Sequence, residues 1–115
     1  MKRFLAFALF TFVAGCASAP QTPAQAVFTA KQDYAVALTA AVAYKNLPKC
    51  PTVAKVCSNP AIISQLQKAD DAASALLDGA EVTVRTGGSN TQMAITAATQ
   101  AVAAFTSITK TLGSQ

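Results

Sequence analysis

The sequence predicts an all-α protein whose main part is an up-down-up bundle of three helices. In three segments the apolar residues recur at spacings of three and four, which is the period of one helix face. The second and third segments are separated by a very short connection, so the corresponding helices must run antiparallel. Hydrophobic residues make up 52% of the chain and charged residues only 12%. Much of the apolar content is alanine, which favours helices that pack closely.

The first helix is expected to begin after Thr22, with Pro23 in its first turn. Thr22 and Gln25 have the spacing of a capping box, and proline is favoured at the first helical position. The sequence Leu47-Pro48 ends the segment, because the residue before a proline avoids the helical region. Its expected inner face consists of Val27, Ala30, Tyr34, Leu38, Ala41 and Tyr44 or Lys45.

The second helix is expected to begin at Asn59-Pro60, again a cap residue followed by proline. Thr86-Gly87-Gly88 should end it, since glycine readily adopts the left-handed conformation of a helix C-terminus. Its expected inner face consists of Ile62, Leu66, Ala69, Ala73, Leu76, Ala80 and Val84 or Thr83.

The third helix is expected to begin at residues 89–92, where Ser89 and Gln92 have the spacing of a second capping box. Gly113 is the expected stop signal. Helices of about 25 residues would each be ~37 Å long at 1.5 Å per residue. The expected inner face of this helix consists of Ile95, Ala98, Val102, Phe105, Ile108 and Leu112.

The N-terminus has the pattern of an export signal. Lys2 and Arg3 precede a short apolar run over residues 4–13, and small residues follow. The run is too short to span a bilayer, which takes about 20 residues. Residues 17–19 fit the pattern of an ordinary signal peptidase site, but Pro20 would then follow the cut directly. Proline is a poor residue at that position because it lacks an N–H and its φ is fixed.

The segment Val13-Ala14-Gly15-Cys16 resembles the lipobox of bacterial lipoproteins. The resemblance implies that residues 1–15 are a signal peptide, that Cys16 carries a diacylglyceryl thioether and acyl chains such as palmitate, and that residues 16–21 form a lipidated tether to a bundle over residues 22–115. Several acyl chains make a stable membrane anchor. Ala17 follows the cysteine where aspartate would signal retention. By the enteric sorting rule, the resemblance therefore implies the periplasmic face of the outer membrane.

Cys50 and Cys57 are the two cysteines that remain after lipidation of Cys16. The bacterial envelope is oxidising, so we expect them to form a disulfide that closes the first loop, residues 47–58. A zinc site is disfavoured because the chain has no histidine and only two free thiols. A redox pair is disfavoured because the spacing is not C-x-x-C.

Charge gives only weak information about a partner. The whole chain has a formal net charge of +4, but removal of Lys2 and Arg3 leaves seven basic and five acidic residues, a net charge of +2. This small surplus does not indicate a nucleic-acid partner. The sequence contains no phosphate-binding loop, zinc-protease motif or nucleophile elbow, and we expect no metal, no cofactor and no enzymatic activity.

Four sets of polar residues could have either a functional or a structural role. The first is the acidic residues of the second helix, where Asp78 and Glu81 could form a carboxylate pair, although the spacings Lys68–Asp71 and Glu81–Arg85 favour surface ion pairs. Asp70 is placed to pair with Lys45 or a tyrosine.

The second set is Tyr34 and Tyr44, which are either a ligand shelf or core aromatics with hydroxyls at the edge. The third is residues 86–89, an anion cradle or a plain turn. The fourth is an exposed or self-associating surface formed by Thr96, Thr99, Gln100 and Thr106.

Residues 22–112 also resemble small alanine-rich lipoproteins of alphaproteobacteria and their phages, through residues 43–48, 57–60 and 66–70. The resemblance implies the helical fold and supplies no site residue. We therefore expect a membrane-anchored envelope lipoprotein with a structural or protein-interaction role, in one variant phage- or prophage-encoded and acting in host exclusion or lysis. Its expected partners are the membrane, an envelope protein and, in one alternative, a second copy. The alternative function is a periplasmic small-ligand carrier or an enzyme of unknown chemistry.

Overall fold

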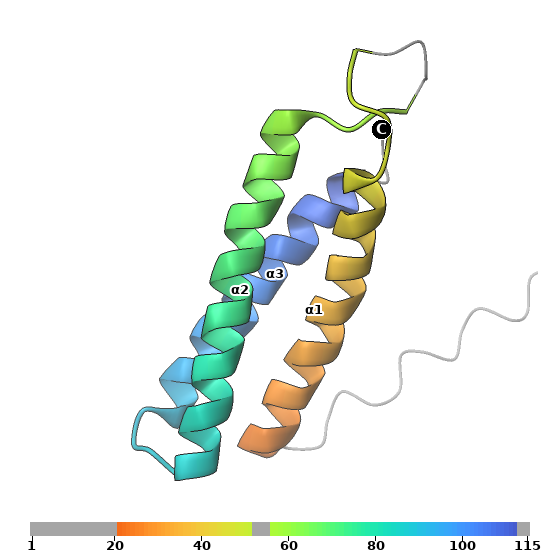
Figure 1. The fold of residues 1–115 in the computed structure, drawn as a ribbon. Helices are drawn as coiled ribbons and strands as arrows, with labels where there is room; N and C mark the ends of the chain where they lie inside the picture. The colour runs from red at the N-terminus through yellow and green to blue at the C-terminus, as the bar shows by residue number, and fades with distance from the viewer. Residues whose placement is uncertain (1–20, 52–55, 113–115) are drawn as a thin grey trace, which may run out of the picture.

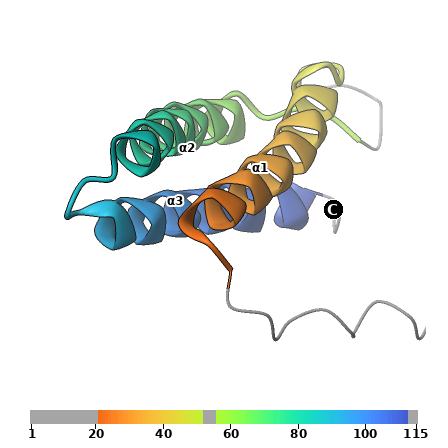
Figure 2. The same cartoon turned by 90° about the horizontal axis from the view of Figure 1, so that it is seen from below.

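The computed structural model describes residues 21–51 and 56–112. They form three α-helices in the expected up-down-up order: α1, Pro23–Lys45; α2, Pro60–Thr86; and α3, Thr91–Leu112. Figure 1 shows α1 and α2 side by side with α3 behind them, and Figure 2 shows α1 inclined across the other two. The predicted all-α three-helix bundle is confirmed. The predicted signal peptide, Cys16 and the stop signal at Gly113 lie outside the described residues.

The start of α1 has the predicted capping box. The Thr22 hydroxyl accepts a hydrogen bond from the Gln25 N–H at 3.3 Å, and the Thr22 N–H donates to Gln25 Oε1 at 2.9 Å. Two of the N–H groups that lack a partner within the helix are thereby satisfied. The helix ends at Lys45, where Asn46 takes the C-cap position two residues before Pro48.

Both ends of α2 also follow the sequence signals. The Asn59 side chain caps the first turn by accepting a hydrogen bond from the Ala61 N–H at 2.8 Å. At the other end Gly87 has a φ of 67°, a left-handed conformation that glycine adopts without steric cost. The turn 87–90 then reverses the chain, as its short length requires.

The capping box predicted for α3 at Ser89 and Gln92 is wrong. The helix begins at Thr91, one residue later than a Ser89 cap requires. The N–H and the hydroxyl of Thr91 both donate to the Gly88 carbonyl, at 3.2 and 2.5 Å. These two bonds close the turn on Gly88, so the helical hydrogen bonds start from Asn90 instead of Ser89.

The core combines small side chains with two large ones. Ala73, Ala80 and Ala98 are at most 1% exposed, which shows that the helix axes approach closely where they cross. Phe105 and Leu77 are the largest fully buried apolar side chains and fill the space between these contacts. The buried apolar residues are Val27, Ala30, Ala37, Ala41, Tyr44, Leu66, Ala73, Leu77, Ala80, Ile95, Ala98, Val102 and Phe105.

The predicted inner face of α2 is wrong at one position. Leu76 is 41% exposed, whereas its neighbour Leu77 is 2% exposed. Successive residues of a helix differ by about 100° in direction, so only one of two adjacent leucines can face the core. The buried stripe follows Leu66, Ala73, Leu77 and Ala80, and this places Leu76 at its edge.

Because the helices meet through alanine, enlarging one of these residues should separate them. We expect Ala73→Leu to lower the free energy of unfolding by about 1–3 kcal/mol, the usual cost of overpacking a well-filled core. Ala72→Leu is the matched control, since Ala72 is exposed on the next position of the same helix. Urea denaturation of both variants tests the expectation. Equal stability of the two variants would contradict close packing at Ala73.

Candidate functional site

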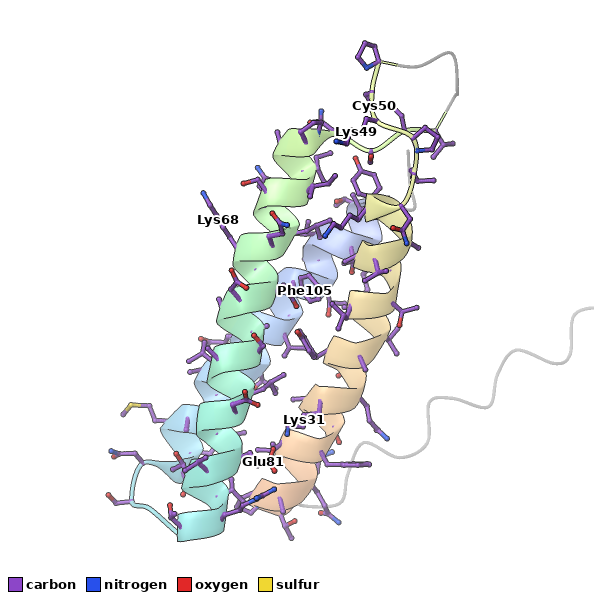
Figure 3. All side chains as sticks on the ribbon, viewed as in Figure 1. Lys31, Lys49, Cys50, Lys68, Glu81 and Phe105 are labelled. Atoms are coloured by element: carbon purple, nitrogen blue, oxygen red, sulfur yellow. A yellow bond between two sulfur atoms is a disulfide. The ribbon has the colours of Figure 1, made fainter. Side chains whose placement is uncertain are left out.

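The seam between α1 and α2 concentrates the polar contacts between helices. Near its middle the Tyr34 hydroxyl donates a hydrogen bond to Asp70 Oδ1 at 2.5 Å, across 36 residues of sequence. The Tyr34 ring also lies against Phe105 of α3, with ring centroids 5.7 Å apart and a tilt of 40°. Figure 3 shows Phe105 between the ribbons of α1 and α2. Asp70 was predicted to pair with Lys45 or with a tyrosine, and its partner is Tyr34.

The surroundings of Tyr34 raise the pKa of its hydroxyl from 10.0 to about 12. The largest cause is desolvation by burial, followed by the hydrogen bond to Asp70 and the negative charge of that carboxylate. Asp78 adds to the increase, whereas Ser74 opposes it. Both burial and neighbouring negative charge disfavour the phenolate, so Tyr34 is held as a neutral hydrogen-bond donor.

A second polar contact joins the two helices closer to the start of α1. Glu81 of α2 pairs with Lys31 of α1 through one carboxylate oxygen and with Arg85, one turn further along α2, through the other. Lys31 and Glu81 are labelled on facing sides of the seam in Figure 3. The predicted Glu81–Arg85 pair is thereby confirmed.

The remaining acidic residues of α2 do not form the alternative carboxylate site. Glu81 is engaged by two cations, while Asp78 is exposed and acts on Tyr34. The predicted pair between Lys68 and Asp71 is wrong: both side chains are exposed, and the ion pairs of the described residues do not include them. Figure 3 shows Lys68 pointing away from the bundle, where solvent competes with a surface ion pair.

The loop between α1 and α2 is closed by contacts within it and is joined to the last turn of α1 through Tyr44. Cys50 and Cys57 form the predicted disulfide, with Cα atoms 5.3 Å apart. The fully buried Ser58 donates from its N–H to the Pro48 carbonyl at 2.8 Å and accepts from the Cys50 N–H at 3.0 Å. The Asn59 N–H donates to the Tyr44 hydroxyl at 2.9 Å. Residues 52–55 of this loop lie outside the described residues.

These contacts decide between the two interpretations of the tyrosines. Tyr44 is 7% exposed, and its hydroxyl accepts the hydrogen bond from the Asn59 N–H. Tyr34 packs on Phe105, and its hydroxyl is used by Asp70. Both are therefore aromatics of the packed interior with a bonded hydroxyl, and neither presents an open ligand shelf.

Hollows on the surface of the described residues include three that bear on a functional site. Two follow the α1–α2 seam: one of about 110 Å³ beside Leu38, Leu66 and Asp70, and one of about 350 Å³ between Phe28 and Val84, rimmed by the Lys31–Glu81–Arg85 group. The third, of about 610 Å³, lies between α1 and α3. Two members of the predicted threonine surface, Thr99 and Thr106, line this third hollow, whereas Thr96 and Gln100 do not.

The polar contacts of the seam join α1 to α2. Among the described residues no group of three potential metal ligands occurs. The turn predicted as an anion cradle or a plain turn links α2 to α3, with Gly87 as the C-cap of α2. Sequence spacing gave no signal for the Lys31–Glu81 pair, because its members are 50 residues apart. The sequence also did not predict that Thr109 is buried. Its hydroxyl can be buried because it donates a hydrogen bond to the Thr106 carbonyl within α3.

Comparison with protein families, with curated proteins and with solved structures gives no match for this chain.

The pKa of Tyr34 leads to a prediction for alkaline pH. The neutral hydroxyl stabilises the fold below pH 10.0, the pKa of an unfolded tyrosine, and this contribution is lost as the pH rises from there to about 12. Tyr34→Phe should lower the free energy of unfolding at pH 8 by about 1–2 kcal/mol, because it removes a hydrogen bond to a charged group. It should also make the decline between pH 9 and 12 shallower than in the wild type.

Urea denaturation of both proteins across this pH range provides the measurement. The lysines titrate in both, so their contribution cancels when the two curves are subtracted. A difference curve that stays flat from pH 9 to 12 would show that Tyr34 does not stabilise the fold as a neutral donor.

Proposed function

We propose that this protein is a lipid-anchored envelope lipoprotein whose helical bundle works by contact with another protein or with the membrane surface. The observation that carries the proposal is the agreement in spacing among Lys2, Arg3, the apolar run 4–13 and Cys16. That combination is typical of lipoprotein export signals. The proposed location is the periplasmic face of the outer membrane.

The position of α1 supports a bundle held close to the membrane. The helix begins at Pro23, so residues 17–21 make up the tether between the lipidated cysteine and the helix cap. Five residues extend under about 20 Å at ~3.4 Å per residue. The start of α1 and the turn 87–90 lie at the same end of the bundle and would therefore face the membrane in an upright arrangement (Figure 1).

None of the helices in residues 21–51 and 56–112 is sufficiently long and apolar to cross a membrane.

The surface of the bundle supports a role in contact. Polar groups of the α1–α2 seam are bonded to one another, as in a structural interface, whereas several large apolar side chains face outward. The most exposed of these are Phe28, Val36, Val82 and Met93, which are 61–74% exposed. Exposed apolar side chains that form a patch commonly mark a surface that contacts another protein or a membrane. Within this proposal, a phage- or prophage-encoded role in host exclusion or lysis is the most specific variant.

A small-ligand carrier is the second candidate, and the hollow at Phe28 favours it. Its volume of about 350 Å³ is at the lower end of the range typical of ligand sites. Its polar rim, however, is occupied by the Lys31–Glu81–Arg85 group, in which the charges satisfy one another. A ligand would have to displace one of these pairs, so we favour the contact role.

Lipidation at Cys16 can be tested directly. Cells that express the full chain should incorporate a palmitate analogue into the wild-type protein and not into Cys16→Ser, because the acyl chains attach at this cysteine. The Cys50→Ser, Cys57→Ser double variant is the control and should be labelled like the wild type. Equal labelling of the wild type and Cys16→Ser would rule out the proposed anchor.

A further inference from the structure

The hollow between α1 and α3 forms an open groove with a small-residue floor and two charges on its rim. Its floor contains the buried residues Ala30 and Val102. Val36, on the α1 side, is 74% exposed, more than any other large apolar residue among those described. The α3 side consists of Thr99, Val102, Ala103, Thr106, Ser107 and Lys110.

The two charges of this groove have no ion-pair partner among the described residues. Asp33 comes from α1 and Lys110 from the last turn of α3, and neither takes part in the ion pairs of the bundle. α1 and α3 run in the same direction; Asp33 is the eleventh of the 23 residues of α1, whereas Lys110 is in the last turn of α3, so Lys110 lies nearer the helix ends than Asp33 does. Val36, one turn after Asp33, lies between them along the groove.

We propose that a second copy of this chain docks in the α1–α3 groove, with the two copies antiparallel about a two-fold axis near Val36. Such an axis brings Asp33 of each copy to Lys110 of the other, so that one arrangement forms two ion pairs. It also covers the exposed Val36 side chains. An interface of this kind is isologous, the commonest type in soluble oligomers.

The charges select the antiparallel arrangement over the parallel one. A two-fold axis along the bundle would keep Asp33 level with Asp33 of the other copy and Lys110 level with Lys110, so that like charges are the nearest charges and no ion pair forms. The small residues of the groove favour docking of a helix in either direction, because they let two backbones approach. Charge therefore determines the direction, and the small floor permits the contact.

The antiparallel dimer has a consequence that rests on the proposed lipid anchor. The two copies of α1 begin at opposite ends of the dimer, about 39 Å apart, which is twice the rise of the 13 residues from Pro23 to the axis at Val36 at ~1.5 Å per residue. Each tether extends under about 20 Å. Two anchors in the same membrane therefore require the dimer to lie along the membrane surface instead of standing upright.

The dimer can be tested without the anchor, so its failure is separate from failure of the proposed function. The mature chain, residues 16–115 with Cys16→Ser, retains all residues of the described bundle and is measured by sedimentation equilibrium. We expect a monomer–dimer equilibrium. Asp33→Lys and Lys110→Asp should each raise the dimer Kd about tenfold or more, because each replaces two ion pairs with two repulsive contacts. Both substitutions in one chain should restore the wild-type Kd.

Matched controls are available on α2. Asp71→Lys and Lys68→Asp make the same charge changes at exposed positions outside the groove and should leave the Kd unchanged. Circular dichroism of every variant checks that the helices form. As a second measurement, Val36→Cys should give a disulfide-linked dimer on mild oxidation, since the two copies meet near this residue.

A monomer at all concentrations would overturn the proposal. A dimer whose Kd is unchanged by Asp33→Lys and Lys110→Asp would overturn it as well, because the copies would then meet elsewhere. The same conclusion would follow if the double substitution did not restore the wild-type Kd. Assemblies larger than two would contradict a closed two-fold interface.

Discussion

The packing of Phe105 is the interaction on which the rest of the bundle depends. Its side chain is fully buried and belongs to α3, yet it contacts the Tyr34 ring of α1 and borders the hollow beside Leu66 of α2. All three helices therefore meet at one aromatic ring. Most of the other buried side chains are alanines and short aliphatics, which let the axes approach but bury little apolar area individually. Phe105 supplies the large area that these residues lack.

The polar seam follows from this arrangement. Because Phe105 enters between α1 and α2 from behind, these two helices meet each other at the surface through polar groups, namely Tyr34 with Asp70 and Lys31 with Glu81. Burial is the largest cause of the raised pKa of Tyr34, and the Tyr34 ring packs against Phe105. The polar residues that looked most like a functional site are thus part of the packing, whereas Asp33 and Lys110, which take part in no ion pair of the described residues, lie in the α1–α3 groove.

Sequence reasoning succeeded where structure is local and failed where it is not. Helix number, helix order and the caps at Thr22, Asn59 and Gly87 could be predicted, because capping residues, prolines and 3.6-residue periodicity act within a few residues. The choice between Leu76 and Leu77 depends on how α2 rotates against its neighbours, and no local signal fixes that rotation. The Lys31–Glu81 pair and the groove arise from side chains far apart in sequence. The predicted start of α3 was wrong because Thr91 donates its hydrogen bonds to the Gly88 carbonyl, and the helix then begins after the expected Ser89 cap.

The central claim, that one buried ring joins the three helices, is tested most directly by Phe105→Ala with Phe28→Ala as its control. Phe28 is 62% exposed, so its truncation removes the same atoms without opening the core. Urea denaturation followed by circular dichroism should show a loss of about 3–5 kcal/mol for Phe105→Ala and a much smaller loss for Phe28→Ala. A loss below about 1 kcal/mol for Phe105→Ala, or equal losses for the two variants, would contradict the account.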